Sequence, residues 1–153
     1  MIKIRITLEN KTDVIRELFI NQEQSLEHLH KDIVKNFGLE SFEMASFYIT
    51  NSKLDLGQEI PLFDVSDSGV KVITMDRIEI SSVLYSQDSQ LIYVYDFLKM
   101  WRFYIEYIEM IDNEKAGCIK SIGNMPNEAP EIKFTQEFNS YNDNSEEYEE
   151  ECI

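Results

Sequence analysis

The sequence is poor in basic residues and has no long apolar segment. Only 14 Lys and Arg residues stand against 29 Asp and Glu, and the formal charge is −15. Charge of this sign repels phosphate backbones and anionic membrane surfaces, so direct binding of nucleic acid is not expected. No apolar run approaches the roughly 20 residues of a membrane-spanning helix, and the opening MIKIRITLEN lacks the basic and apolar blocks of a secretion signal. We therefore expect a cytoplasmic protein with no membrane partner.

Cysteine is also scarce, because Cys118 and Cys152 are the only two. Two cysteines are too few for a disulfide scaffold or for a zinc site with four ligands. We therefore expect free thiols, and neither a metal nor a cofactor. The sequence also lacks a phosphate-binding glycine loop, a nucleophile elbow and a Ser-His-Asp order. No motif points to catalysis.

The first 38 residues predict a hairpin and a helix. Isoleucine and leucine alternate with polar residues at 2–9, and a second run rich in β-branched residues follows at 14–21, which predicts two paired strands. Apolar residues then recur at helical spacing over 26–37. Ser25 precedes them as an N-cap and Gly38 follows where helices often end, so we predict a helix at 26–37.

Residues 91–111, LIYVYDFLKMWRFYIEYIEMI, are rich in aromatic side chains and fit either a helical stripe or the faces of strands. Tyr, Phe, Trp, Ile and Val favour strands, so we predict two strands at 90–97 and 101–111 with a break near 98–100. The other expected elements are strands at 44–50 and 70–75, a long loop at 51–69 and one helical turn at 81–86. Together they predict a single α+β domain, with one helix packed on a mixed or mainly antiparallel sheet.

The C-terminal part has a different composition. Residues 112–134 contain two glycines, two prolines and little periodicity, so we predict no strand of the sheet in this segment. Residues 139–153 contain six acidic residues and no basic one, which is typical of disordered segments. We predict a folded domain at 1–138 and a disordered acidic tail at 139–153.

Several short motifs occur in an order that resembles the plasmid pRiA4b open-reading-frame-three-like family. They are VIREL, SLEHLHKDIVKNFG, SFYI, and YVYDF followed after three residues by Trp101. EMASFYITN, GQEIPLFD and SIGNMPNEAPE further resemble the branch of this family that is common in Bacteroidetes. The resemblance covers roughly residues 2–130. It implies a small α+β protein with no established activity and, through the family's insertion-element label, a link with mobile DNA.

The sequence departs from the broader family pattern at two places. Where the pattern has a Trp and two His after the helix-ending glycine, this chain has Leu39, Glu43 and Ala45. Where it has Gly-Asp after the YDF motif, this chain has Leu98 and Lys99. These departures argue against a site built from those histidines or that aspartate.

Two histidines and one aspartate are the candidates for chemistry. His28 and His30 lie two positions apart in one helix and point to different sides, so they cannot bind a metal together. His30 either joins a ligand site or borders the core and hydrogen-bonds a backbone carbonyl while His28 is exposed, and we favour the core role. Asp96, between Tyr95 and Phe97, either acts as a general base or ligand anchor, or caps the turn between two strands, and we favour the cap.

The aromatic residues of this segment allow two interpretations. Tyr93, Tyr95, Trp101, Phe103 and Tyr104 either form a stacking platform or pack in the core. Binders of single-stranded nucleic acid combine aromatic residues with a basic groove, which is missing here, so we predict core packing. Tyrosine hydroxyls can still reach the surface, and one face can line a groove.

Three functions remain open. The first is a non-enzymatic domain that recognises a protein partner, with His30, Tyr93, Tyr95, Asp96 and Trp101 as candidate binding residues. The second is a small-ligand binder or enzyme that uses Asp96 and His30. The third is an accessory role in transactions of mobile DNA. Charge and the absence of catalytic motifs favour the first.

Overall fold

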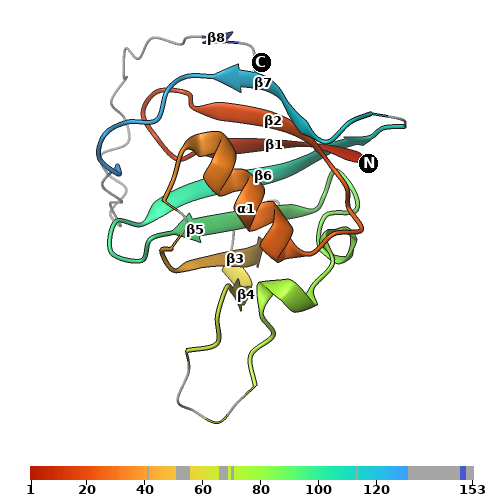
Figure 1. Cartoon of the computed structure of the whole chain (residues 1–153), viewed down its shortest axis with the longest axis vertical. Helices are drawn as coiled ribbons and strands as arrows, with labels where there is room; N and C mark the ends of the chain where they lie inside the picture. The colour runs from red at the N-terminus through yellow and green to blue at the C-terminus, as the bar shows by residue number, and fades with distance from the viewer. Residues whose placement is uncertain are drawn as a thin grey trace.

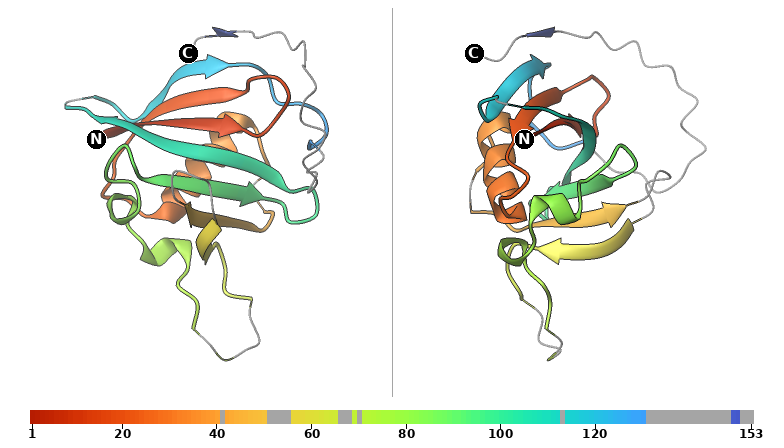
Figure 2. Two further views of the ribbon diagram at one scale, coloured as in Figure 1. Left: turned by 180° about the vertical axis from the view of Figure 1, so that it is seen from behind. Right: turned by 90° about the vertical axis from the view of Figure 1, so that its right-hand side faces the viewer.

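In the part of the chain that the structure describes, the fold is one antiparallel sheet with a single α-helix on one face. The computed structural model describes residues 1–40, 42–50, 56–65, 69, 71–112, 114–130 and 149–150. The helix is α1 (Leu26–Phe37), and the strands are β1 (Ile2–Leu8), β2 (Ile15–Ile20), β3 (Ala45–Thr50), β4 (Leu56–Pro61), β5 (Gln90–Tyr95), β6 (Trp101–Met110), β7 (Gly117–Ile122) and β8 (Glu149–Glu150). Their spatial order is β4-β3-β5-β6-β1-β2-β7-β8 (Figure 1). The view turned by 90° shows α1 on one side of the sheet (Figure 2). The predicted α+β fold is confirmed.

The first two strands and the helix form as predicted. β1 and β2 pair as an antiparallel hairpin, with Ile4 opposite Leu18. α1 has the predicted bounds, because Ser25 Oγ accepts a hydrogen bond from the backbone N–H of His28 and Gly38 ends the helix at a φ of 66°. These signals are local, and so they could be recognised without knowledge of the rest of the chain.

The aromatic segment forms two neighbouring strands, as predicted. β5 and β6 pair with Tyr93 opposite Phe103 and Tyr95 opposite Trp101, and a turn at 97–99 joins them. β1 pairs with the other side of β6. β5 and β6 therefore lie inside the sheet, which explains why so many of their residues are apolar.

Three parts of the prediction were wrong or incomplete. The strand expected at 70–75 is absent from the described residues 71–75, and Met75–Arg77 and Ile80–Ser82 form short 3-10 turns instead. The backbone N–H groups of Leu26 and Ile80 bond to Ile78 and Gln24, so this segment is held against the start of α1 and pairs with no named strand. The Ile80–Ser82 turn overlaps the helical turn expected at 81–86 only at residues 81 and 82, so that expectation is confirmed only in part. β4 and β7 were not expected as full strands, because their exposed outer faces give weak apolar patterns.

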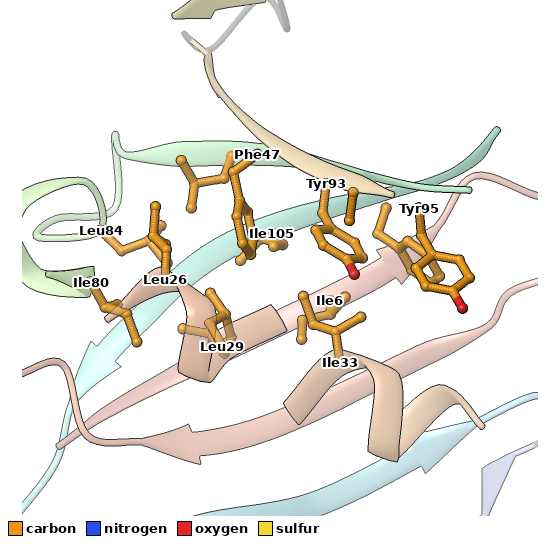
Figure 3. Packing of buried hydrophobic residues seen from close by; sticks show 14 of the residues in the cluster. Ile6, Leu26, Leu29, Ile33, Phe47, Ile80, Leu84, Tyr93, Tyr95 and Ile105 are labelled. Carbon is orange, nitrogen blue, oxygen red and sulfur yellow. The ribbon is translucent and has the colours of Figure 1, made fainter. Parts of the chain in front are cut away.

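The core lies between α1 and the sheet. Ile6 from β1, Leu29 and Ile33 from α1, Phe47 from β3 and Tyr93 from β5 are all fully buried and pack in one cluster (Figure 3). The Tyr93 ring centroid lies 4.9 Å from that of Phe47. The predicted core role of the aromatic residues is therefore confirmed for Tyr93, Tyr95, Trp101 and Phe103, whereas Tyr104 is only partly buried.

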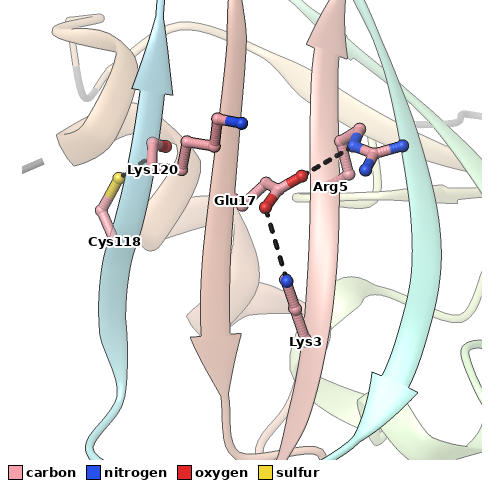
Figure 4. Close-up of polar contacts among 5 residues, drawn as sticks. All are labelled: Lys3, Arg5, Glu17, Cys118 and Lys120. Carbon is pink, nitrogen blue, oxygen red and sulfur yellow. Dashed lines mark hydrogen bonds and ion pairs between the residues drawn. The ribbon is translucent and has the colours of Figure 1, made fainter. Parts of the chain in front are cut away.

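The sheet face away from α1 has polar contacts across its strands. Glu17 Oε2 lies 2.9 Å from Arg5 Nε, and its Oε1 lies 3.6 Å from Lys3 Nζ (Figure 4).

Cys118 is disulfide-bonded, so the expectation of a free thiol is wrong for this residue, and Cys152 lies outside the described residues. Cys118 Sγ lies 3.3 Å from the carbonyl oxygen of Lys120. Because a disulfide sulfur carries no proton, this contact is not a hydrogen bond.

The predicted disordered tail at 139–153 lies outside the described residues except for β8. There, Glu149 and Glu150 pair with Ile122 and Ser121 of β7. In the part of the chain that the structure describes, no helix is both long and apolar enough to cross a membrane.

Candidate functional site

The structure separates the five predicted site residues into two groups. His30 and Tyr93 form a buried pair between α1 and the middle of β5. Tyr95, Asp96 and Trp101 lie together where β5 ends, the turn at 97–99 begins and β6 starts. The two groups are neighbours along β5, but they differ in their partners.

His30 and Tyr93 share a hydrogen bond inside the protein. His30 Nδ1 lies 2.6 Å from the Tyr93 hydroxyl, and the two side chains are 4% and 0% exposed. Burial lowers the pKa of His30 below its ordinary value and raises that of Tyr93, so both groups are neutral near pH 7. The predicted burial of His30 and exposure of His28 are confirmed. The expected carbonyl partner is wrong, because the Tyr93 side chain reaches His30 from the sheet.

His30 also lines a hollow beside α1. The hollow has a volume of about 480 Å³ and lies between α1 and the residues that follow β4. Val34, Leu39, Leu62 and Phe63 form its apolar part, and its charged residues are Glu27, Lys31 and Lys35. Asp96 is not among its lining residues, so His30 and Asp96 do not meet in this hollow.

Asp96 organises the turn between β5 and β6. Its φ of 61° lies in the left-handed region, which Asp tolerates better than most residues. Its Oδ1 accepts hydrogen bonds from the backbone N–H groups of Leu98 at 3.1 Å and Lys99 at 3.2 Å. Its own N–H donates to the carbonyl of Met44, which ties this turn to the loop before β3. The favoured turn-capping role of Asp96 is confirmed.

Tyr95 is buried with an unsatisfied hydroxyl. The residue is 3% exposed, and among the described residues its hydroxyl oxygen has no hydrogen-bond partner. Burial raises the pKa of Tyr95 to about 12, with smaller contributions from Glu43, Glu40 and Asp96. The hydroxyl is therefore protonated, and carboxylates lie near it. Figure 3 shows it pointing away from Tyr93 and the rest of the core.

These residues line a groove at the end of α1 and β5, which we call the Trp101 groove. Its volume is about 470 Å³. The walls combine aromatic and aliphatic side chains with three carboxylates and one lysine, and they are formed by Phe37, Gly38, Leu39, Glu40, Glu43, Tyr95, Asp96, Leu98, Lys99, Trp101, Met125, Pro126 and Asn127. Trp101, the single tryptophan, is 7% exposed. The groove is hence both apolar and acidic.

Exposed apolar side chains come from the two loops beside this groove. Leu98 is 95% exposed and Phe42 is 80% exposed, and Phe97 and Met100 are each 40% exposed. The backbone bond from Asp96 to Met44 brings the two loops together. Apolar residues gathered in this way around a hollow are typical of recognition surfaces.

The sequence predicted three residues of the Trp101 groove as site residues, namely Tyr95, Asp96 and Trp101, and it did not predict the others. Glu40, Glu43 and Leu98 gave no signal of their own, because they come from loops without periodicity. Leu39, Glu43, Leu98 and Lys99 were noted only as departures from the family pattern, and all four line the Trp101 groove. Nothing in the order of the chain places the loop after α1 next to the loop after β5.

The described residues do not form a metal centre. No group of three or more His, Cys, Asp or Glu side chains in this part of the chain is placed to hold a metal ion. The carboxylates of the Trp101 groove therefore surround a space without converging on one point.

Comparison with known proteins agrees with this fold. The chain matches the plasmid pRiA4b ORF-3-like proteins over residues 1–153. It belongs to this family. It is also similar to the crystal structure of a protein of unknown function from Methanosarcina mazei Go1, with 16% identity and a TM-score of 0.65 over 79% of this chain and 68% of the other. No curated protein matches the chain. The family description names no activity, so the comparisons support the family and the fold but no specific function.

Proposed function

We propose that this chain is a non-enzymatic recognition domain that binds a protein partner through the Trp101 groove. The observation that carries the proposal is the set of exposed apolar side chains at its rim, above all Leu98 with 95% of its surface exposed. A solvent-exposed leucine on a tight turn contributes nothing to the core. It can contribute to binding, because burying such a side chain in an interface is favourable by about 1.5–3 kcal/mol.

The proposal is tested by quantitative pull-down from cell lysate with three proteins. These are the wild type, Leu98→Asp in the groove rim and Met110→Asp at the other end of β6, where the side chain is 62% exposed. We expect a stoichiometric partner with the wild type and with Met110→Asp, and its loss with Leu98→Asp. A partner that Leu98→Asp retains, or no stoichiometric partner at all, contradicts the proposal.

A second candidate function is binding or conversion of a small molecule at the hollow beside His30. It is favoured by the burial of His30 next to a hollow of about 480 Å³. Chemistry that uses His30 and Asp96 in one step is not favoured, because Asp96 lines the other hollow. Native mass spectrometry of the purified protein tests this function, since a retained small molecule that His30→Gln releases would support it.

Three further assignments complete the proposal. We propose a cytoplasmic location, because two cysteines in 153 residues are too few for the disulfide scaffold of a small secreted domain. We assign it to the Bacteroidetes-type branch of its family on the three motifs quoted above. A role in transactions of mobile DNA would require contact with a DNA-handling protein, because a charge of −15 opposes direct contact with DNA. DNA affinity of the purified chain at low salt would speak against that view.

A further inference from the structure

The Tyr95 hydroxyl and the carboxylates around it point to the chemistry of the partner. A buried hydroxyl without a hydrogen-bond partner is uncommon in folded proteins and needs an explanation. This one lies in a residue that is 3% exposed, and Tyr95 lines the Trp101 groove. A ligand that donates a hydrogen bond to this oxygen would satisfy its acceptor capacity.

The charge of the groove has one dominant sign. Glu40, Glu43 and Asp96 line it, and Lys99 is the one cation among its lining residues. Asp96 Oδ1 accepts both backbone bonds of the turn, whereas Oδ2 accepts none of the described hydrogen bonds. The groove thus presents hydrogen-bond acceptors and negative charge to an incoming group.

The walls of the groove are apolar and aromatic. Phe37, Leu39 and Trp101 are buried or partly buried residues of its walls, and Leu98 is exposed at the rim. A side chain that suits this space needs an apolar stem, several donors and a positive charge. Arginine combines all three, and its planar guanidinium also stacks on aromatic rings and pairs with carboxylates through two hydrogen bonds.

We propose that the Trp101 groove receives an arginine side chain from an exposed segment of a partner protein, with a neighbouring apolar residue of that segment packed on Leu98. This inference rests on the proposed function and specifies its ligand. The guanidinium would donate to the Tyr95 hydroxyl oxygen and pair with Glu43 or Glu40. The strong negative charge of the chain would speed the approach of such a basic segment.

The same features exclude other occupants of this groove. Residues 139–153 of the chain carry six acidic residues and no basic one, so their charge is of the wrong sign. A second copy brings another −15 charges, which repel at the distances of a contact. Nucleic acid is repelled for the same reason, and the described carboxylates do not converge on a metal ion.

The inference is tested with peptides, read out by the fluorescence of Trp101. The probe is a library of nonapeptides with arginine at the centre and random flanks without tryptophan, compared with the same library carrying neutral citrulline at the centre. We expect full-length protein to enrich the arginine library. The best peptides should shift Trp101 emission and bind roughly tenfold or more weakly when citrulline replaces arginine. Equal enrichment of both libraries, or of neither, overturns the inference.

Three variants locate the binding site. Glu43→Gln should weaken the best peptide roughly tenfold, whereas Glu109→Gln, on the exposed far end of β6, should leave its affinity unchanged. Tyr95→Phe should weaken binding while the thermal midpoint stays equal or rises, because the variant removes a buried unsatisfied hydroxyl. Unchanged affinity in both groove variants overturns the inference. A lysate partner that depends on Leu98 but on neither Glu43 nor Tyr95 would leave the proposed function standing and contradict the arginine.

Discussion

The hydroxyl of Tyr93 lies 2.6 Å from Nδ1 of His30, and this hydrogen bond joins the helix to the middle of the sheet. Both side chains are buried, and the ring centroids are 5.8 Å apart. A protonated His30 would have to carry its charge inside the core, which is unfavourable. The pair is therefore a stable polar link only while His30 is neutral.

Stability should fall as His30 becomes protonated. Burial lowers the pKa of folded His30, Glu27 raises it by less, and Lys31 lowers it slightly. Between the folded pKa of His30 and the unfolded value of about 6.5, the unfolded chain binds a proton that the folded chain does not. The contribution of neutral His30 to the free energy of unfolding is therefore present above pH 6.5 and is lost as pH falls through the folded pKa. Urea titrations from pH 7.5 to 5 should show this loss.

His30→Gln should flatten the pH dependence in that window, and His28→Gln should not, because His28 is exposed. Asp32 adds a contribution of opposite sign at lower pH, since burial raises the pKa of its carboxyl. An unchanged pH profile in His30→Gln would show that His30 is not the group responsible.

Asp96→Ala should destabilise the turn between β5 and β6 by about 1–2 kcal/mol. The substitution removes the acceptor for the N–H groups of Leu98 and Lys99 and leaves a β-carbon at a φ of 61°. Asp96→Asn is the matched control and should stay within about 0.5 kcal/mol, because an amide oxygen still accepts and Asn tolerates this φ. Equal losses in both variants, measured by urea unfolding, would mean that the charge of Asp96 matters more than its turn bonds.

Arg16→Met should cost about 2–3 kcal/mol of unfolding free energy. The Arg16 side chain is buried, donates to the carbonyls of Asn36, Ile122 and Gly123, and lies with its guanidinium carbon 5.0 Å from the centre of the Phe37 ring. It thus joins the end of α1 to the end of β7. Arg16→Lys should lose part of this stability, because a single ammonium cannot reach all these carbonyls. Wild-type stability in Arg16→Met would contradict this role.

A chain of residues 1–138 should still unfold cooperatively. The predicted boundary leaves α1 and β1 to β7 intact and removes β8, whose two residues make two register pairs with β7. Circular dichroism melts of both chains should be recorded in reducing buffer, so that the disulfide of Cys118 does not distinguish them. Loss of a cooperative transition in the shorter chain would refute the boundary.

The parts of the fold that could be predicted are those with local signals. The helix follows from its apolar spacing, from Ser25 and from Gly38, and the first hairpin follows from alternation in neighbouring strands. β7 could not be predicted in this way, because it lies next to β2 and its residues 117–122 alternate weakly. The residues at 70–75 have strand-forming side chains, but the described ones pair with no neighbouring strand.

The sequence by itself determined the family, the α+β class, the acidic charge and the use of the aromatic segment as strands, because these depend on composition and short-range periodicity. Only the tertiary structure decided which polar groups meet. Residues 63 positions apart in the chain form the bond between His30 and Tyr93. The loops after α1 and β5 likewise come together as the Trp101 groove, since strand order β3-β5-β6 is set by the packing of the whole sheet and not by any one segment.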